Sequence, residues 1–294
     1  MTQSFDARRW WLLVTKHWSE NKKKYSLSLL AIGGLLLLWG MFLIFSGRHA
    51  PNWEVQVNSY YIGLYVVGCL YASLLFADLG SKTRGLNYLV VPASHAEKLA
   101  CNLFYGIVVF FCCYTALYYV VDVLTVKTGN ALAYSDWLSR HAAKETFNPQ
   151  RVANLFGAGD HLDELTGYSI YLLLFYLVLQ SAFIYGSLFF ARFSFIKTVL
   201  SLMLIALLVS LVVSKLIEPI LPPGTFKNNL AIFQVFTVKP STEGNGVMIY
   251  SDPSTDKIVS LPTWIGQLLT LLLKFAFAPL LWLASFYRLK EKEI

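Results

Sequence analysis

Uncharged apolar runs, separated by short clusters of charged residues, recur along the whole chain. The first run, Tyr25 to Phe45, has 21 residues without a charge, and as a helix it would be about 31 Å long. This length matches the hydrocarbon thickness of a bilayer. Alternating strand-type hydrophobicity is absent, so the runs predict membrane-spanning helices. We expect six spans, at about 25–45, 57–76, 99–121, 168–191, 198–217 and 261–287.

Composition supports a fold buried in lipid. Hydrophobic residues make up 56% of the chain and charged residues 14%, against roughly 45–50% and about 25% in a soluble domain. A water-soluble globule of this composition would lack charged side chains to cover its surface. The sequence therefore predicts an all-α integral membrane protein. Its four cysteines lie in apolar runs, without disulfide or zinc spacing.

The basic residues predict the orientation of the spans. With both termini in the cytoplasm, the cytoplasmic segments hold 14 Lys and Arg. The opposite side holds 9, with Lys215 at the outer end of the fifth span included, together with 11 of the 17 acidic residues. The side richer in Lys and Arg is normally cytoplasmic. The net charge of +7 is thus explained by topology, and we expect no nucleic-acid partner.

The segment 1–24, before the first span, has an amphipathic pattern. Trp10, Trp11 and Trp18 recur near helical spacing, and Lys and Arg lie largely elsewhere on the wheel. Tryptophan and lysine at this place are typical of a cytoplasmic helix in the headgroup plane, anchored to anionic lipid. A generic basic anchor is the alternative interpretation.

Two longer segments, 122–167 and 218–260, are predicted outside. In the first we expect helices within 126–166, one of them capped by Ser135 and Asp136 and another beginning near Asp160. The acidic residues and histidine near Asp160 fit a first helical turn, where the helix dipole favours them, so we expect no metal site. In the second segment, a small hairpin is predicted across 230–251.

Catalytic motifs are missing from the chain. No GxxxxGK[ST], HExxH or GxSxG pattern occurs, and the spans contain no nucleophile with a base or facing carboxylates. We therefore expect no enzyme activity in this chain. Lys274 is the intramembrane charge, and its cost in lipid predicts a cavity, a partner such as Asp122 or Glu218, or a snorkelling position.

The connection 77–98 is the most patterned stretch of the chain. Pro92 disfavours the helical region for the residue before it, and Ser94 stands three residues before Glu97. This spacing predicts a capping box that starts the third span. The polar and aromatic residues upstream fit either a partner protein or a lipid-facing turn.

This arrangement resembles the membrane subunits of ABC-2 type exporters. The resemblance rests on an amphipathic helix followed by six spans, and on the stretch Tyr88 to Leu99, which is similar to the family's "L-P-x-S…K" stretch. It implies that the connection contacts a separate ATPase subunit. The contact residues it implies are Lys82, Arg84, Tyr88, Pro92, Ser94 and Glu97.

The resemblance implies an exporter permease in the bacterial cytoplasmic membrane, working as a homodimer or pseudo-dimer. ATP and Mg would be bound by the partner ATPase, and this chain would hold no cofactor. The alternative from another class is a non-transporting membrane scaffold or anchor subunit of a larger envelope complex, acting through its outer loops.

Overall fold

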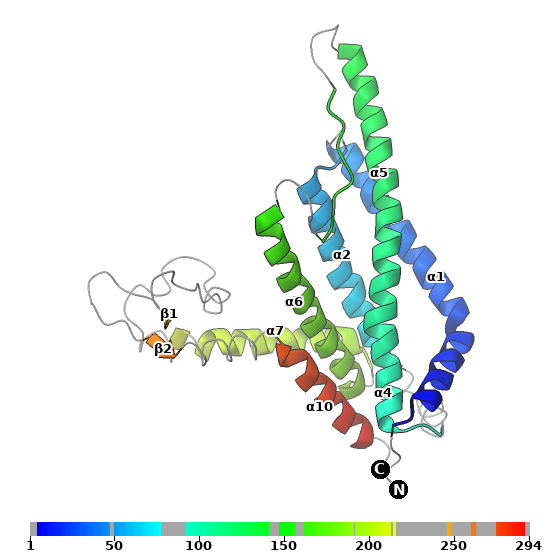
Figure 1. Ribbon diagram of the computed structural model, residues 1–294, viewed down its shortest axis with the longest axis vertical. Coiled ribbons are helices and arrows are strands. Elements are labelled where there is room, and N and C mark those ends of the chain that lie inside the picture. Colours follow the sequence, from blue (N-terminus) through cyan, green and yellow to red (C-terminus); the bar gives the residue numbers. More distant parts are fainter. Residues whose placement is uncertain are drawn as a thin grey trace.

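The computed structural model describes residues 5–47, 50–77, 92–140, 147–156, 162–190, 192–212, 214–215, 246–248, 260–262 and 275–291. These ranges are helical apart from short turns and loop segments and two short strands (Figure 1). The helices are α1 (Ala7–Gly47), α2 (Trp53–Leu74), α4 (His95–Leu103), the π-helix η2 (Phe104–Val109), α5 (Phe110–Arg140), α6 (Leu162–Phe189), α7 (Ser194–Val212) and α10 (Phe277–Glu291). The strands are β1 (Gly246–Met248) and β2 (Ser260–Pro262).

Five of the described helical stretches are long and apolar enough to cross a membrane. They are Ala7–Gly47, Trp53–Leu74, His95–Ser139, Ser169–Phe189 and Ser194–Val212. The chain is therefore a multi-pass membrane protein by the length and composition of its helices. Of the predicted sixth span, 261–287, the structure describes 261–262, which lie in β2 and not in a helix, and 275–287, most of which belongs to α10. Lys274 lies outside the described residues.

Helix α1 joins two predicted segments. It has 41 residues, which corresponds to about 60 Å, twice the hydrocarbon thickness of a bilayer. The predicted interfacial segment and the predicted first span lie in this one helix, without an interruption between them.

The helix of the predicted third span is longer than the apolar run. Helices α4, η2 and α5 follow one another without a gap, and α5 reaches Arg140, so it extends past the neighbouring helices at one end of the molecule (Figure 1). Of the range 126–166, in which helices are expected, α5 covers the first part, but the separate start at Ser135 and Asp136 is wrong. The Ser135 hydroxyl donates to the Leu132 carbonyl within α5, at 2.8 Å, and does not cap a new helix. The apolar run marks only the part of the helix that lies in lipid, and the helix can continue beyond it into water. The second expected start, at Asp160, lies outside the described residues, and α6 is described from Leu162.

A glycine lies at each of two helix crossings, where the small residue lets the helices approach closely. A Cβ on Gly68 of α2 would be 2.8 Å from the ring of Tyr176 on α6. A Cβ on Gly186 of α6 would overlap Thr198 of α7. Helix α7 runs across the direction of α2 and α6 (Figure 1). Of the residues of α7, only Thr198 is buried.

Tyrosine fills the core between α1, α2 and α5. Tyr60 and Tyr114 are almost fully buried, and their hydroxyls are paired. Tyr60 Oη lies 2.9 Å from the Thr115 hydroxyl, and Tyr114 Oη donates to the Tyr60 carbonyl at 3.1 Å. This pairing satisfies polar groups that would be costly to bury alone.

The strand pair in the structure begins and ends later in the chain than the hairpin predicted across 230–251. Strand β1 pairs antiparallel with β2, and Val247 is opposite Leu261. Of the predicted range 230–251, the structure describes only β1, and the strand that pairs with it follows that range.

Candidate functional site

The start of α4 lies beside the start of α1, and this junction contains the predicted capping box. Ser94 is the N-cap, with extended backbone angles, and its hydroxyl accepts from the Glu97 amide at 3.2 Å. In return, the Ser94 amide donates to Glu97 Oε2 at 2.9 Å. The capping box predicted from the sequence is therefore confirmed.

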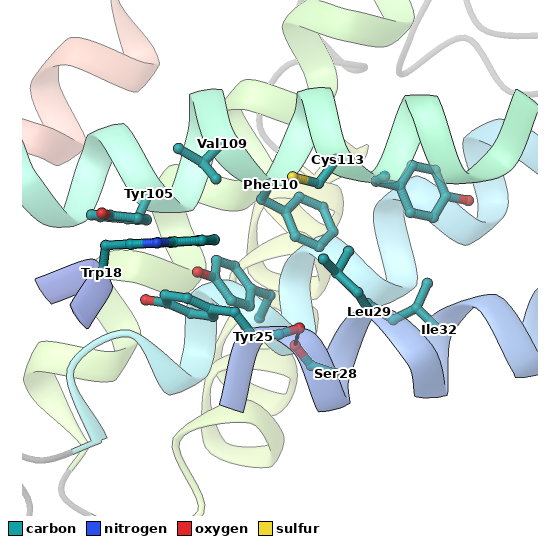
Figure 2. A pocket seen from close by; sticks show the side chains of 11 residues that line it. Trp18, Tyr25, Ser28, Leu29, Ile32, Tyr105, Val109, Phe110 and Cys113 are labelled. Carbon is teal, nitrogen blue, oxygen red and sulfur yellow. Dashed lines mark hydrogen bonds between the residues drawn. The ribbon is translucent and has the colours of Figure 1, made fainter. Parts of the chain in front are cut away.

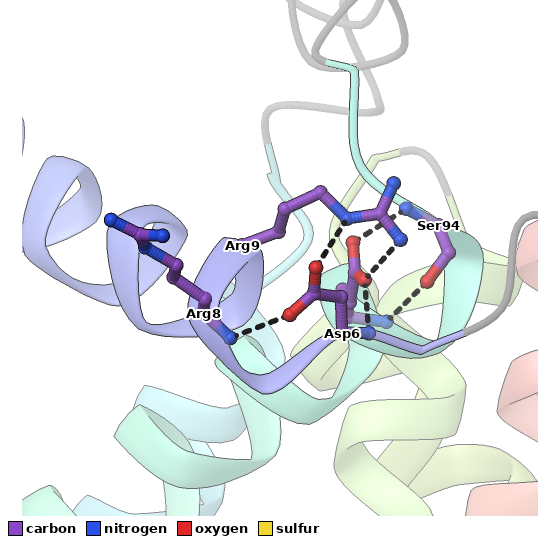
Figure 3. Close-up of polar contacts among 5 residues, drawn as sticks. Asp6, Arg8, Arg9 and Ser94 are labelled. Atoms are coloured by element: carbon purple, nitrogen blue, oxygen red, sulfur yellow. Dashed lines mark hydrogen bonds and ion pairs between the residues drawn. The ribbon is translucent and has the colours of Figure 1, made fainter.

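Glu97 has a second set of partners, on the N-terminal segment (Figure 3). Its other carboxylate oxygen, Oε1, accepts from the Asp6 amide at 2.8 Å and lies 3.2 Å from Arg9 Nη2. The Glu97 side chain has no exposed surface. A buried carboxylate is stable only when it is paired, and here two amides and a guanidinium supply that pairing.

Asp6 completes the junction from the other helix. Its carboxylate accepts from the Arg8 amide at 2.8 Å, and its carbonyl accepts from the Trp10 amide, so it acts as the N-cap of α1. Asp6 Oδ2 also lies 3.8 Å from Arg9 Nε. The N-terminal ends of α1 and α4 are thus linked through one ion-pair cluster.

Aromatic rings extend this contact along α1. Trp10 meets Phe104 edge to face, with ring centroids 5.7 Å apart. Tyr105 donates its hydroxyl to the Val14 carbonyl at 2.8 Å and lies against the His17 ring. The first part of α1 therefore packs on α4 and η2 over several turns, which sequence periodicity does not reveal.

The three tryptophans of the predicted interfacial helix lie in different surroundings. Trp10 is partly buried against Phe104. Trp11 is 58% exposed and Trp18 is 48% exposed. Two of the three predicted residues are therefore available to lipid.

The residues predicted for partner contact are only partly described. Lys82, Arg84 and Tyr88 lie outside the described residues. Pro92 is exposed, whereas Ser94 and Glu97 are buried. At the described end of the connection, an exposed proline thus precedes a buried polar pair.

Gln56 forms a second buried polar cluster, near the opposite end of the bundle. Its side-chain amide donates to the carbonyls of Pro51 and Arg151, at 2.8 and 3.1 Å. Its carbonyl oxygen accepts from the Ala153 amide at 2.7 Å. The segment 147–156 is thereby fastened to α2, and Asn130 on α5 binds both polar backbone atoms of Gln150.

Asp122, a candidate partner of Lys274, is also buried. Among the described residues, its Oδ2 has no hydrogen-bond partner. Asp122 lines a small pocket together with Trp39, Ser59 and Thr125. The other candidate partner, Glu218, lies outside the described residues.

Comparison of the chain with protein-family models, curated proteins and solved structures found no match.

Proposed function

We propose that this chain is the permease subunit of an ATP-driven ABC-2 type exporter in a bacterial cytoplasmic membrane. Both termini would lie in the cytoplasm, two permease copies would form the pathway, and separate ATPase subunits would dock on the 77–98 connection. The observation that carries the proposal is the buried link between Arg9, Glu97 and Ser94 at the end of that connection.

The link is suited to transmit a force from a docked ATPase. Ser94 starts a helical stretch of 45 residues, His95–Ser139, about 68 Å long. Arg9 belongs to α1, which also continues through the apolar region. Movement of the connection would therefore reach two long helices at once, since both begin at one ion-pair cluster.

The buried position of Glu97 refines its proposed role. The Glu97 side chain has no exposed surface, so it would hold the docking surface in place from below and would not contact the ATPase itself. Pro92, which is exposed, and the sequence-predicted Lys82, Arg84 and Tyr88 would make the contact with the ATPase. Trp11 and Trp18 would hold the first part of α1 at the cytoplasmic headgroups.

The proposed topology has support from the arrangement of helix ends. The end of α10 and the start of α1 lie at the end of the molecule where α4 begins (Figure 1). This agrees with both termini on one side and an even number of crossings, which the sixth predicted span would supply.

Affinity purification from native membranes tests this function. The tagged full chain, extracted in mild detergent, should carry with it an ATPase that has the GxxxxGK[ST] pattern, and the complex should hydrolyse ATP. Arg84→Ala should release that ATPase, whereas Asn58→Ala, an exposed change on α2, should not. Isolation without an ATPase, or equal retention by both variants, would contradict the proposal.

The scaffold alternative is supported by one observation, the fastening of the segment 147–156 by Gln56 and Asn130. A fixed outer segment is what a partner outside the membrane would need. If this alternative holds, Gln56→Ala should release a co-purified envelope protein, and Arg84→Ala should leave the complex unchanged.

A further inference from the structure

A pocket of about 50 Å³ lies between α1, α2, η2 and α5, where aromatic rings form most of its wall (Figure 2). Tyr25 of α1 stacks on Trp18 and on Tyr105, with centroids 5.9 and 5.7 Å apart. Deeper in the wall, Phe110 stacks on Tyr71 at 5.0 Å. The pocket therefore offers flat apolar surfaces to a ligand.

Two residues of the wall, Tyr105 and Val109, belong to the π-helix η2. A π-helical turn changes the direction of the side chains that follow it and is frequent at functional sites. Leu29 and Ile32 of α1 provide aliphatic contacts opposite this turn (Figure 2). The pocket lies next to helices that are apolar enough to be in lipid, so the available apolar ligand is an acyl chain.

A lysine lies on the same helical face as the pocket. Trp18, Tyr25, Leu29 and Ile32 of α1 all line the pocket. When Lys22 is added to these four residues, successive positions are 4, 3, 4 and 3 residues apart. Residues with this spacing lie on one face of a helix. Lys22 is exposed. An ammonium group is thus placed beside an apolar pocket, which is complementary to a lipid with an anionic headgroup.

We propose that this pocket binds an anionic phospholipid, with part of one acyl chain against the stacked rings and the headgroup phosphate on Lys22. The pocket is too small for a whole lipid, so the rest of the molecule lies along the outer surface of α1. The lipid contacts α1, α2 and the η2–α5 helix together and stabilises their packing. The proposal is independent of the exporter function, because it uses neither the 77–98 connection nor a partner ATPase.

The chain offers a matched pair of variants for each half of the site. Cys113 lines the pocket, whereas the neighbouring Cys112 is exposed, so Cys113→Leu fills the pocket and Cys112→Leu is its control. Lys22 and Lys23 are both exposed. Lys22 lies on the pocket face of α1, whereas Lys23 points about 140° away from Trp18. Lys22→Gln and Lys23→Gln remove the same charge at the two positions.

Native mass spectrometry of the purified full chain, titrated with phosphatidylglycerol or with phosphatidylcholine of identical acyl chains, measures the binding. The wild type should bind phosphatidylglycerol more tightly. Cys113→Leu should weaken the binding of both lipids about tenfold. Lys22→Gln should weaken only phosphatidylglycerol, about fivefold, as expected for one lysine near an anionic surface. Both control variants should behave like the wild type.

Equal affinity of the wild type for the two lipids would overturn the proposal, as would equal effects of the two cysteine variants or of the two lysine variants. If Cys113→Leu does not fold, the lysine pair alone decides, because both of its members are exposed and do not disturb packing.

Discussion

Arg9 Nη2 lies 3.2 Å from Glu97 Oε1, and this ion pair links the first turn of α1 to the first turn of α4. Glu97 is fully buried, whereas the Arg9 side chain is 38% exposed. The carboxylate also accepts the amides of Asp6 and Ser94, one on each oxygen. All three partners need an acceptor, so the charge and the geometry of Glu97 are both required.

We expect Glu97→Gln to loosen the N-terminal part of α1. The new amide group would place a donor against a backbone N–H donor. The Arg9 guanidinium would lose the closer of its two carboxylate partners and keep only Asp6, at 3.8 Å. The free energy of unfolding should fall by about 1–3 kcal/mol, a range that allows for solvent screening at Arg9. Unfolding in detergent measures this loss, and trypsin should cleave earlier at Arg8, Arg9 or Lys16.

The exposed pair Lys16 and Glu20 provides the control for this variant. Its side chains are 53% and 59% exposed, and the charged atoms are 3.8 Å apart. Glu20→Gln should change the free energy of unfolding by less than about 0.5 kcal/mol. Equal stability and equal protease resistance of the two variants would show that the Glu97 cluster does not hold α1.

Ser94→Ala should destabilise the start of α4. The hydroxyl accepts the Glu97 amide at 3.2 Å, and loss of such an N-cap costs about 1 kcal/mol. Amide hydrogen exchange in residues 95–98 should become faster. Ser201→Ala is the control, since that exposed hydroxyl donates within α7 to the Lys197 carbonyl and caps no helix. Unchanged exchange in Ser94→Ala would contradict the capping role.

Sequence reasoning could predict the capping box but not the ion pair. Ser94 and Glu97 are three residues apart, and capping depends only on this local spacing. Asp6 and Glu97 are 91 residues apart, and nothing local brings them together. A carboxylate in a first helical turn is expected from the dipole alone, so Glu97 carried no sign that it was fully buried.

The end of the third predicted span also differs from the end of its helix, because the sequence pattern does not report helix length. The apolar run that ends at Val121 gives the boundary of the predicted span, but α5 continues to Arg140. Hydropathy reports contact with lipid, whereas helix length depends on backbone hydrogen bonds and side-chain propensity. The sequence also does not indicate the buried polar cluster formed by Gln56. The partners of this side chain in the segment 147–156 are distant in the sequence, so its neighbours along the chain could not reveal them.

We expect Gln56→Ala to release the segment 147–156 from α2. The side chain makes three hydrogen bonds, to Pro51, Arg151 and Ala153, and alanine would leave the Ala153 amide without its acceptor. Hydrogen exchange at Ala153 should accelerate at least about tenfold, the equivalent of one lost hydrogen bond of about 1.4 kcal/mol. Asn58→Ala, an exposed change on the same helix, should leave this exchange unchanged. Equal exchange in both variants would show that other contacts hold the segment.

Gly186→Val should disturb the crossing of α6 and α7. A Cβ at this position would overlap the Thr198 hydroxyl and lie 2.8 Å from Thr198 Cγ2, so α7 would have to move away from α6. Overpacking of this kind costs about 1–3 kcal/mol. Gly34→Val is a matched control, because a Cβ there meets nothing within 4 Å and both glycines are within helices, so the β-branched side chain has a similar intrinsic cost. Thermal unfolding in detergent should occur at a lower temperature for Gly186→Val than for Gly34→Val. If the two transitions coincide, the close approach of α6 and α7 at Gly186 does not contribute to stability.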